Sequence, residues 1–277
     1  MKVLVTGANG MLGQDLCPIL EDAGYEVVET DIANLDITKS DDVNRVITEE
    51  NPDYVIHCAA YTNVDKAEED LDTATKINVQ GTENLAKACA NADATLVYIS
   101  TDYVFDGTKN EPYLPTDKTN PINNYGLTKC RGEEAVQKYC EKYYIARTSW
   151  LYGHHGKNFV ETMISLADKP ELKVVDDQIG CPTWTVELSN GILKLIDNKP
   201  YGIYHVCGSS STSWFGFAKE IFKQMKLDVN LKPCATKDFP RPAKRPAYSI
   251  MDNGGICRDW KVALSDYIAL RPESEEL

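Results

Sequence analysis

The stretch that decides the fold is KVLVTGANGMLG at residues 2–13. Residues 2–6 are mostly apolar and β-branched, which predicts a buried strand. Gly7, Gly10 and Gly13 follow at intervals of three, where a helical pattern begins. In such a unit Gly7 permits the tight turn, Gly10 lets the backbone approach a pyrophosphate, and Gly13 lets the helix pack on the strand. The free N–H groups at the helix N-terminus would bind that anion, although glycine-rich turns also occur for purely structural reasons.

Strands and helices alternate through the first half of the chain. Apolar runs predict further strands at residues 26–31, 54–59, 96–101 and 144–150, and helical spacing predicts helices at 10–23, 40–50, 67–91 and 124–143. Strands that are nearly continuously apolar are expected where helices cover both faces of a parallel sheet. The alternation implies right-handed crossovers. The fold class is therefore α/β, with a Rossmann-type doubly wound parallel sheet.

The second half of the chain is less regular. We expect helices at 158–168 and 186–197, a loop at 178–183 and a strand at 201–207 that can rejoin the sheet. A Pro-rich segment at 232–246, a short helical segment and an acidic, frayed tail at 272–277 follow. This predicts a dinucleotide-binding domain made of residues 1–149 plus 185–207, and a smaller, discontinuous C-terminal substrate domain made of residues 150–184 plus 208–277.

Composition narrows the class of protein. The 277 residues are 43% hydrophobic and 26% charged, as in soluble globular proteins. The net charge of −13 would repel a polyanion, so we expect no nucleic-acid partner. No apolar run approaches the length of a membrane span, and the N-terminus begins with a strand pattern rather than a signal peptide. Nine cysteines without a CxxC pair indicate reduced thiols and a cytoplasmic location.

Two acidic residues are placed to bind an adenosine ribose. Asp31 ends the second predicted strand, 18 residues beyond Gly13, and Asp36 is a second candidate near the adenine. Either carboxylate could instead serve as a turn residue or helix N-cap. An acid at Asp31 favours NAD, but the nearby Lys39 leaves NADP open.

A second motif, YGLTK, occupies residues 125–129 near the start of a predicted helix. Spacing of four places Tyr125 and Lys129 on one face, so the ammonium can favour the phenolate and lower the pKa of the phenol. Tyr125 is then a plausible proton donor to a carbonyl oxygen. Thr101 ends the fourth strand at the carboxyl edge of the sheet, where its hydroxyl can polarise the same carbonyl. Without these partners the motif would be an ordinary surface pair.

Other conspicuous residues fit structural roles. The His154-His155 pair lacks the further ligands of a metal site and is typical of a loop. Cys58, Cys130 and Cys140 fit buried or idle thiols better than nucleophiles. The aromatic residues of 214–222 have helical spacing and are expected in the core.

The ordered motifs resemble a known family. TGANGMLG, CAAYTNVDKAE, STDYVFDG, YGLTK and RTSWLYG, followed by QIGCPT and RPAYSIMD, are similar to motifs of the extended short-chain dehydrogenase/reductase superfamily. More narrowly, they resemble the dTDP-4-dehydrorhamnose reductase family. The match runs through most of the chain in order.

The resemblance implies roles for further residues. Thr101, Tyr125 and Lys129 would form the catalytic triad, with Lys129 also on the nicotinamide ribose. The remaining implied residues would line the cofactor (Gly10, Met11, Leu12, Asp36, Ile37, Ala59, Ala60 and Tyr61), contact the sugar or nucleotide (Asn63, Val64, Asp102 and Trp150), or stand beside the triad (Asn78). We add Arg245 as a candidate clamp for a diphosphate.

The implied reaction is hydride transfer from NADPH or NADH to carbon 4 of a 4-keto-6-deoxy sugar on thymidine diphosphate. Some relatives bind magnesium at a dimer interface, so the resemblance allows a homodimer and a Mg²⁺ site at Asp15 and Glu187. No other metal site is expected. A sugar-nucleotide epimerase or dehydratase, or a catalytically idle nucleotide-binding regulatory subunit, are the alternatives. Tyr103-Val104 after Asp102, where dehydratases usually carry Glu, argues against a dehydratase.

Overall fold

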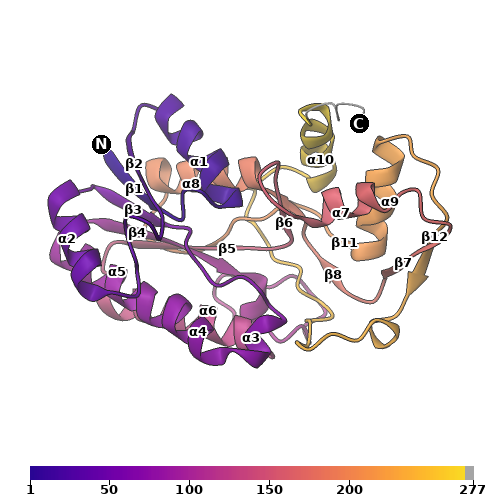
Figure 1. Cartoon of the computed structure of the whole chain (residues 1–277), viewed down its shortest axis with the longest axis horizontal. Helices are drawn as coiled ribbons and strands as arrows, with labels where there is room; N and C mark the ends of the chain where they lie inside the picture. The colour runs from indigo at the N-terminus through magenta and orange to yellow at the C-terminus, as the bar shows by residue number, and fades with distance from the viewer. Residues whose placement is uncertain (272–277) are drawn as a thin grey trace.

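The central sheet contains six parallel strands in a computed structural model that describes residues 1–271 (Figure 1). The strand order is β10-β5-β4-β3-β1-β2, and every neighbouring pair is parallel. The crossovers make the sheet doubly wound, which confirms the predicted fold class. The strands are β1 (Lys2–Thr6), β2 (Glu26–Thr30), β3 (Tyr54–His57), β4 (Thr95–Thr101), β5 (Tyr143–Thr148) and β10 (Gly202–His205).

Helices cover both faces of this sheet (Figure 1). On one face α1 (Met11–Asp22) and α8 (Thr185–Asn198) bury a cluster with Val5, Leu16 and Leu188 at its centre. On the other face lie α2 (Ser40–Glu50), α5 (Thr82–Asn91) and α6 (Asn124–Tyr139). They bury a second cluster that includes Leu4 and Leu85. Burial on both faces explains why the strands are almost continuously apolar.

One predicted helix is broken into several. Residues 67–91 were expected to form one helix, but they form α3 (Lys66–Glu69), α4 (Leu71–Thr75), the π-helical segment η1 (Lys76–Gly81) and α5. The break falls at Asp70, whose φ is −130° and whose side chain accepts a hydrogen bond from the Thr73 N–H. A new helix therefore begins at an N-cap inside the periodic stretch.

Two other predicted boundaries were wrong in detail. The strand expected to reach residue 150 ends at Thr148, because Trp150 lies in the left-handed region with φ 47°. The loop expected at 178–183 contains β8 (Ile179–Gly180) and the start of β9 (Thr183–Trp184), which pair with β11 (Thr212–Ser213) and β6 (Leu151–Tyr152). The expected return of the chain to the sheet is confirmed, since β10 pairs with β5.

The C-terminal part has a hydrophobic cluster of its own. Phe217, Phe222 and Trp260 are buried there, while Trp214 and Phe215 are partly buried against it. Its elements include α7 (Phe159–Ser165), β7 (Leu172–Val175), α9 (Trp214–Gln224), β12 (Leu231–Cys234), the short 3-10 turn η3 (Thr236–Asp238) and α10 (Trp260–Ala269). Another short 3-10 turn, η2 (Asp102–Val104), follows β4. The two-domain division predicted above remains a proposal. The tail at 272–277 lies outside the described residues.

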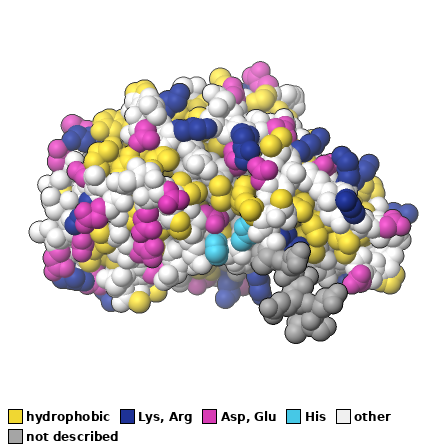
Figure 2. All heavy atoms as spheres, turned by 90° about the horizontal axis from the view of Figure 1, so that it is seen from above, with side chains coloured by type: hydrophobic (Ala, Val, Ile, Leu, Met, Phe, Trp, Pro, Cys, Tyr) yellow, Lys and Arg dark blue, Asp and Glu magenta, His cyan; other side chains and the backbone are white. Residues whose placement is uncertain are grey.

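Charged side chains are mixed over the surface. On the face drawn in Figure 2, basic side chains lie singly or in small groups among acidic and neutral ones, apart from what the undescribed residues cover. Within residues 1–271, no helix combines the length and the apolar character needed to cross a bilayer.

Candidate active site

A cavity of about 650 Å³ opens at the carboxyl ends of the central strands. Open parallel sheets bind their ligands at this edge. The wall joins the glycine turn after β1, the segments after β2 and β3, the ends of β4 and β5, and the start of α6. Of the residues predicted from sequence, the wall includes Gly7, Gly10, Met11, Leu12, Gly13, Asp31, Asp36, Ile37, Ala59, Ala60, Val64, Thr101, Asp102, Tyr125, Lys129 and Trp150. Tyr61, Asn63 and Arg245 are not part of the wall.

The glycine turn has the geometry that its sequence indicated. Gly7 has φ 68°, and a Cβ there would stand 2.8 Å from the backbone nitrogen of Ala59. A Cβ on Gly13 would stand 2.4 Å from the carbonyl oxygen of Ala8, so α1 packs directly on the turn. Gly10 is the N-cap of α1, and no side chain caps the helix there. A Cβ on Gly10 would have one neighbour within 4 Å, the Gly7 oxygen at 3.1 Å. The first N–H groups of α1 therefore face open space, as an anion site requires.

The two candidate ribose carboxylates are held differently. Asp31 accepts hydrogen bonds from the N–H groups of Asn9 (3.2 Å) and Ile32 (2.7 Å) beside the turn. Asp36 accepts bonds from the Thr38 hydroxyl and N–H and lies 3.4 Å from Lys39 Nζ. The Thr38 hydroxyl bond and the Lys39 ammonium hold the pKa of Asp36 below its usual range, against a smaller effect of burial. Lys39 is thereby paired with Asp36.

The cavity contains Thr101, Tyr125 and Lys129 together. The Asn123 side chain caps α6 by accepting the Gly126 N–H at 2.7 Å, which places Tyr125 in the first turn and Lys129 one turn later. Thr101 ends β4, donates to Asp102 Oδ1 (3.0 Å) and accepts the N–H of Tyr103 (3.2 Å). The three groups therefore border one space reached from the glycine turn.

The pKa values of Tyr125 and Lys129 differ from our expectation. We expected the ammonium to lower the pKa of the phenol, but burial raises it well above its usual value, the Asp102 carboxylate raises it further, and hydrogen bonding from Thr101 only partly offsets this. Burial lowers the pKa of Lys129 to about 7, although the Glu133 carboxylate opposes this shift. The Lys129 Nζ lies 4.1 Å from the Tyr98 ring centroid. Tyr125 is thus protonated at neutral pH.

Two buried polar atoms in the cavity wall have no partner among the described residues. They are Asp102 Oδ2 and Thr148 Oγ1. Burial raises the pKa of Asp102 to about 6, although the nearby Ser249 and Thr101 hydroxyls oppose the shift. Unpaired buried polar atoms are rare in native proteins and are expected where a ligand completes the bonding.

Asn78 and Trp150 shape the wall. Asn78 lies in the π-helical segment, 1% exposed, and binds the Tyr61 N–H (2.8 Å) and carbonyl (3.1 Å). It therefore fixes the backbone of the predicted cofactor segment from behind. The Trp150 indole stacks on Trp214 with ring centroids 3.5 Å apart, and a Cβ on Gly180 would stand 2.5 Å from its other side. The indole is thus held between two surfaces at the rim.

Arg245 is engaged by protein groups. Its guanidinium forms a two-pronged ion pair with Asp65, with NH2 2.9 Å from Oδ2, and its NH1 donates to the Ala243 carbonyl at 2.7 Å. The Arg245 bond lowers the pKa of the Asp65 carboxyl. Its role as a diphosphate clamp remains a prediction.

The proposed magnesium residues do not form a cluster. Asp15 accepts a hydrogen bond from Thr185 and lies 3.4 Å from His155, whereas Glu187 is paired with Arg258. Among the described residues, no group of three or more His, Cys, Asp or Glu side chains could hold a metal ion. Mg²⁺ therefore gains no support here.

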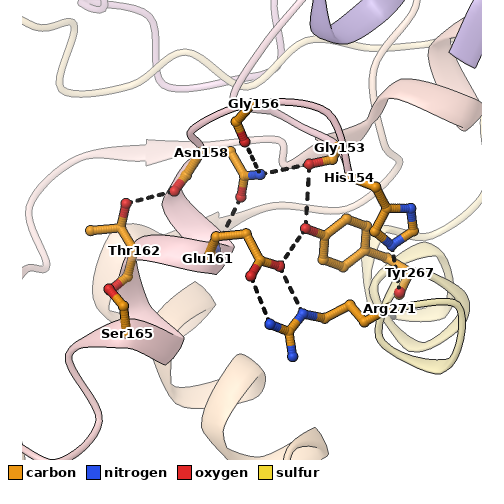
Figure 3. A network of polar contacts seen from close by, with 9 residues as sticks. All are labelled: Gly153, His154, Gly156, Asn158, Glu161, Thr162, Ser165, Tyr267 and Arg271. Atoms are coloured by element: carbon orange, nitrogen blue, oxygen red, sulfur yellow. Dashed lines mark hydrogen bonds and ion pairs between the residues drawn. The ribbon is translucent and has the colours of Figure 1, made fainter. Parts of the chain in front are cut away.

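The segment around His154 is a structural network (Figure 3). The His154 ring stacks on Tyr267 at 4.2 Å, and Asn158 donates to the Gly153 carbonyl at 2.7 Å. Glu161 accepts bonds from the Tyr267 hydroxyl and from Arg271. These contacts fit the structural role that we expected for His154.

Sequence reasoning missed several wall residues. Tyr103 packs edge-on to Tyr125 at 5.6 Å, Thr148 ends β5 and Ser149 follows it at the carboxyl edge. For Tyr103 the available signal was its position just after the strand predicted at 96–101, whereas Thr148 and Ser149 fell inside the strand predicted at 144–150. Behind the wall, Glu133 on α6 accepts bonds from Arg147 (2.7 Å) and Ser100 (2.5 Å).

Comparisons with known proteins agree with this geometry. The family model described as RmlD substrate binding domain matches residues 1–270. A dTDP-4-dehydrorhamnose reductase from Streptomyces griseus is 41% identical, with 95% of this chain and 91% of that protein covered. A crystal structure of a dTDP-4-dehydrorhamnose reductase from Clostridium acetobutylicum is similar with 49% identity, a TM-score of 0.95 and 98% and 99% of the two chains covered. A reductase of the same name from Bacillus anthracis, solved in complex with NADP, has 44% identity, a TM-score of 0.94 and 97% and 98% coverage.

Proposed function

The chain belongs to the RmlD substrate binding domain family, and from this premise we propose that it is a dTDP-4-dehydrorhamnose reductase. In this reaction NADPH or NADH reduces the 4-keto group of dTDP-4-dehydro-L-rhamnose, and dTDP-L-rhamnose is the product. It would supply activated rhamnose for polysaccharide synthesis. We also propose that the enzyme works in the cytoplasm, because its nine cysteines are free thiols. The family resemblance further suggests a homodimer. Light scattering would measure the mass of that assembly.

The cavity fits a dinucleotide. Gly7, Gly10 and Gly13 keep side chains away from the turn, and the N-terminus of α1 would hold the pyrophosphate. Asp31 stands where a carboxylate can accept the hydroxyls of the adenosine ribose. When bound, a reduced nicotinamide supplies the hydride. The Lys129 ammonium would bind the nicotinamide ribose, and this bond would favour its charged form.

Tyr125 would donate the proton. The high pKa of its phenol keeps the proton in place until negative charge develops on the ketone oxygen. Thr101 would donate a second hydrogen bond to that oxygen once its hydroxyl turns from Asp102. The positively charged Lys129 would stabilise the phenolate that remains.

The substrate would occupy the end of the cavity near Asp102, Thr148 and Trp150. Asp102 Oδ2 and Thr148 Oγ1 offer unpaired groups for sugar hydroxyls, and Trp150 adds an apolar side chain to the wall. Val64 lines the same cavity, while Arg245 and Asn63 would contact the nucleotide only after a rearrangement. Mg²⁺ is not part of the proposal.

The observation that carries the proposal is that Thr101, Tyr125 and Lys129 border one cavity with the glycine turn. The test supplies the 4-keto sugar nucleotide with NADPH deuterated at the transferable position. A reductase consumes one cofactor for each product and leaves deuterium at carbon 4 of the sugar. An epimerase returns the hydride without net consumption, and a regulatory subunit gives no product, so either result would exclude the reductase.

A further inference from the structure

Asn123 uses both ends of its side chain. Its Oδ1 accepts the Gly126 N–H at 2.7 Å and so caps the helix that carries Tyr125. Its Nδ2 donates to the carbonyl of Lys244 at 2.7 Å, across 121 positions of sequence. Asn123 is 7% exposed, so bulk water has little access to the groups that form these two hydrogen bonds. The start of the catalytic helix is therefore tied to a distant segment.

That segment, residues 241–247, is irregular in structure and is called here the strap. Besides Asn123 it is attached at three points: Asp65, Gly107, and Ile179, whose N–H donates to the Ala247 carbonyl at 2.9 Å. Asp65 accepts the Ala243 N–H at 3.2 Å and binds the Arg245 guanidinium. Pro246 packs so closely on Gly107 that a Cβ there would stand 2.7 Å from the Pro246 Cα. The strap thus bridges the segments that follow β3 and β4.

The attachment points of the strap adjoin the substrate end of the cavity. Val64, next to Asp65, lines the cavity. Tyr103 also lines it, and its ring packs edge-on to Tyr125 at 5.6 Å. The Arg245 charge opposes the rise that burial causes in the pKa of the Tyr103 phenol. Tyr103 also touches the catalytic helix, since a Cβ on Gly126 would stand 2.1 Å from the Tyr103 carbonyl oxygen. A displaced strap would release both walls around the sugar.

We propose that Asn123 is a positioning residue that couples the strap to the catalytic helix, so that the substrate end of the cavity is shaped only while the Asn123–Lys244 bond is made. This inference rests on the proposed function as far as the sugar nucleotide is concerned. The tether itself does not depend on it. The cofactor end of the cavity lies on β1, β2 and α1, and Asn123 makes no bond there.

One substitution separates the two bonds of Asn123. Asn123→Asp keeps an oxygen that caps α6, and Asp caps helices as well as Asn does. It replaces the donor to Lys244 with a second acceptor, so the tether is lost. Asn158 is a matched control: its Oδ1 caps α7 at 3.1 Å and its Nδ2 donates to the Gly153 carbonyl at 2.7 Å, in the network of Figure 3, where no strap residue takes part. Asn158→Asp makes the same chemical change there.

Limited trypsin digestion measures how often the strap opens. Within the strap, the Lys244–Arg245 peptide bond is the one that trypsin cleaves well, because Arg241 and Arg245 each precede a proline. Cleavage requires the strap to open locally. We expect Asn123→Asp to be cut there about tenfold faster than wild type, as the loss of one hydrogen bond predicts, with Asn158→Asp unchanged at this bond.

Kinetics test the coupling to the substrate. For Asn123→Asp we expect the KM of the keto sugar nucleotide to rise about tenfold, while the Kd of NADPH stays within about twofold. Cleavage after Lys244 at the wild-type rate, or an NADPH Kd weakened as much as the KM, would overturn the inference. If wild type turns over no keto sugar, the proposed function fails, and the trypsin result alone decides whether the tether exists.

Discussion

The glycine turn allows a matched pair of substitutions, Gly13→Ala and Gly10→Ala, that separates folding from cofactor binding. A Cβ on Gly13 would stand 2.4 Å from Ala8 O, 2.5 Å from Ala8 Cα and 2.6 Å from Gly7 O. All three atoms are backbone, so α1 must shift as a unit. Overpacking of this kind costs about 1–3 kcal/mol. Alanine's better helix propensity of about 1 kcal/mol offsets part of this cost. We therefore expect a net loss of unfolding free energy of up to about 2 kcal/mol, near the upper end because all three contacts are with backbone atoms.

Gly10→Ala should behave in the opposite way. Gly10 has φ −76°, and its added Cβ would have one neighbour, the Gly7 oxygen at 3.1 Å. The unfolding free energy should change by less than about 1 kcal/mol, the range for an N-cap change. The methyl group would stand where the pyrophosphate must approach the backbone, so the Kd of NADPH should rise at least about tenfold.

Urea denaturation followed by circular dichroism measures the stability of both variants, and fluorescence titration with NADPH measures the Kd. Gly13→Ala should lose stability, and Gly10→Ala should lose affinity. If Gly10→Ala binds NADPH as tightly as wild type, the turn does not hold the pyrophosphate. Equal destabilisation of the two variants would refute the packing argument.

Three further outcomes follow from the buried charges. Asp102→Asn should remove a pH dependence of stability. The pKa of the Asp102 carboxyl is about 6 in the folded protein and exceeds its unfolded value, so the folded wild-type protein binds the proton more tightly. The stability that this provides is lost as pH rises from about 4 to 6. Across that range the urea midpoint of wild type should fall relative to that of the variant, because carboxyls with lowered pKa values, such as Asp36 and Asp65, act equally in both proteins. Arg147→Met leaves the Glu133 carboxylate buried without its ion pair and should lower the unfolding free energy by about 3–5 kcal/mol in urea titrations, whereas a loss below about 1 kcal/mol would contradict this. Added Mg²⁺ should leave the melting temperature unchanged, because Arg258 occupies Glu187; a clear rise would restore the metal site.

Local sequence patterns predicted the sheet because its strands are buried on both faces. The residues of β1 and α2 are the ones that periodicity indicated, since each lies between clear turn or capping signals. The prediction of one long helix at 67–91 was wrong, because a local pattern cannot distinguish the two roles of Asp70: it fits a helical pattern and can also start a new helix. The π-helical segment that carries Asn78 depends on contacts with Tyr61 and Thr128, which no local pattern contains.

The candidate site was predictable where strand ends could be identified. Thr101 and Tyr125 were found because one ends a strand and the other opens a helix at one sheet edge, whereas Asp102 was indicated by the family resemblance. Long-range pairs were not visible in the sequence. The ion pair of Asp65 with Arg245 joins residues 180 positions apart, and it gives the guanidinium a partner within the protein. The pKa of Tyr125 also depended on burial that the YxxxK spacing does not report.

The most direct test of the account compares wild type with Tyr125→Phe in oxidation of NADPH and NADH after dTDP-4-dehydrorhamnose is added, with cofactor affinity measured on both proteins. Removing a positioned proton donor should lower kcat by about 10²–10⁴-fold and leave the cofactor Kd unchanged. Near-wild-type turnover by Tyr125→Phe would contradict the assignment of the proton donor, and no oxidation by the wild-type protein would contradict the reductase itself.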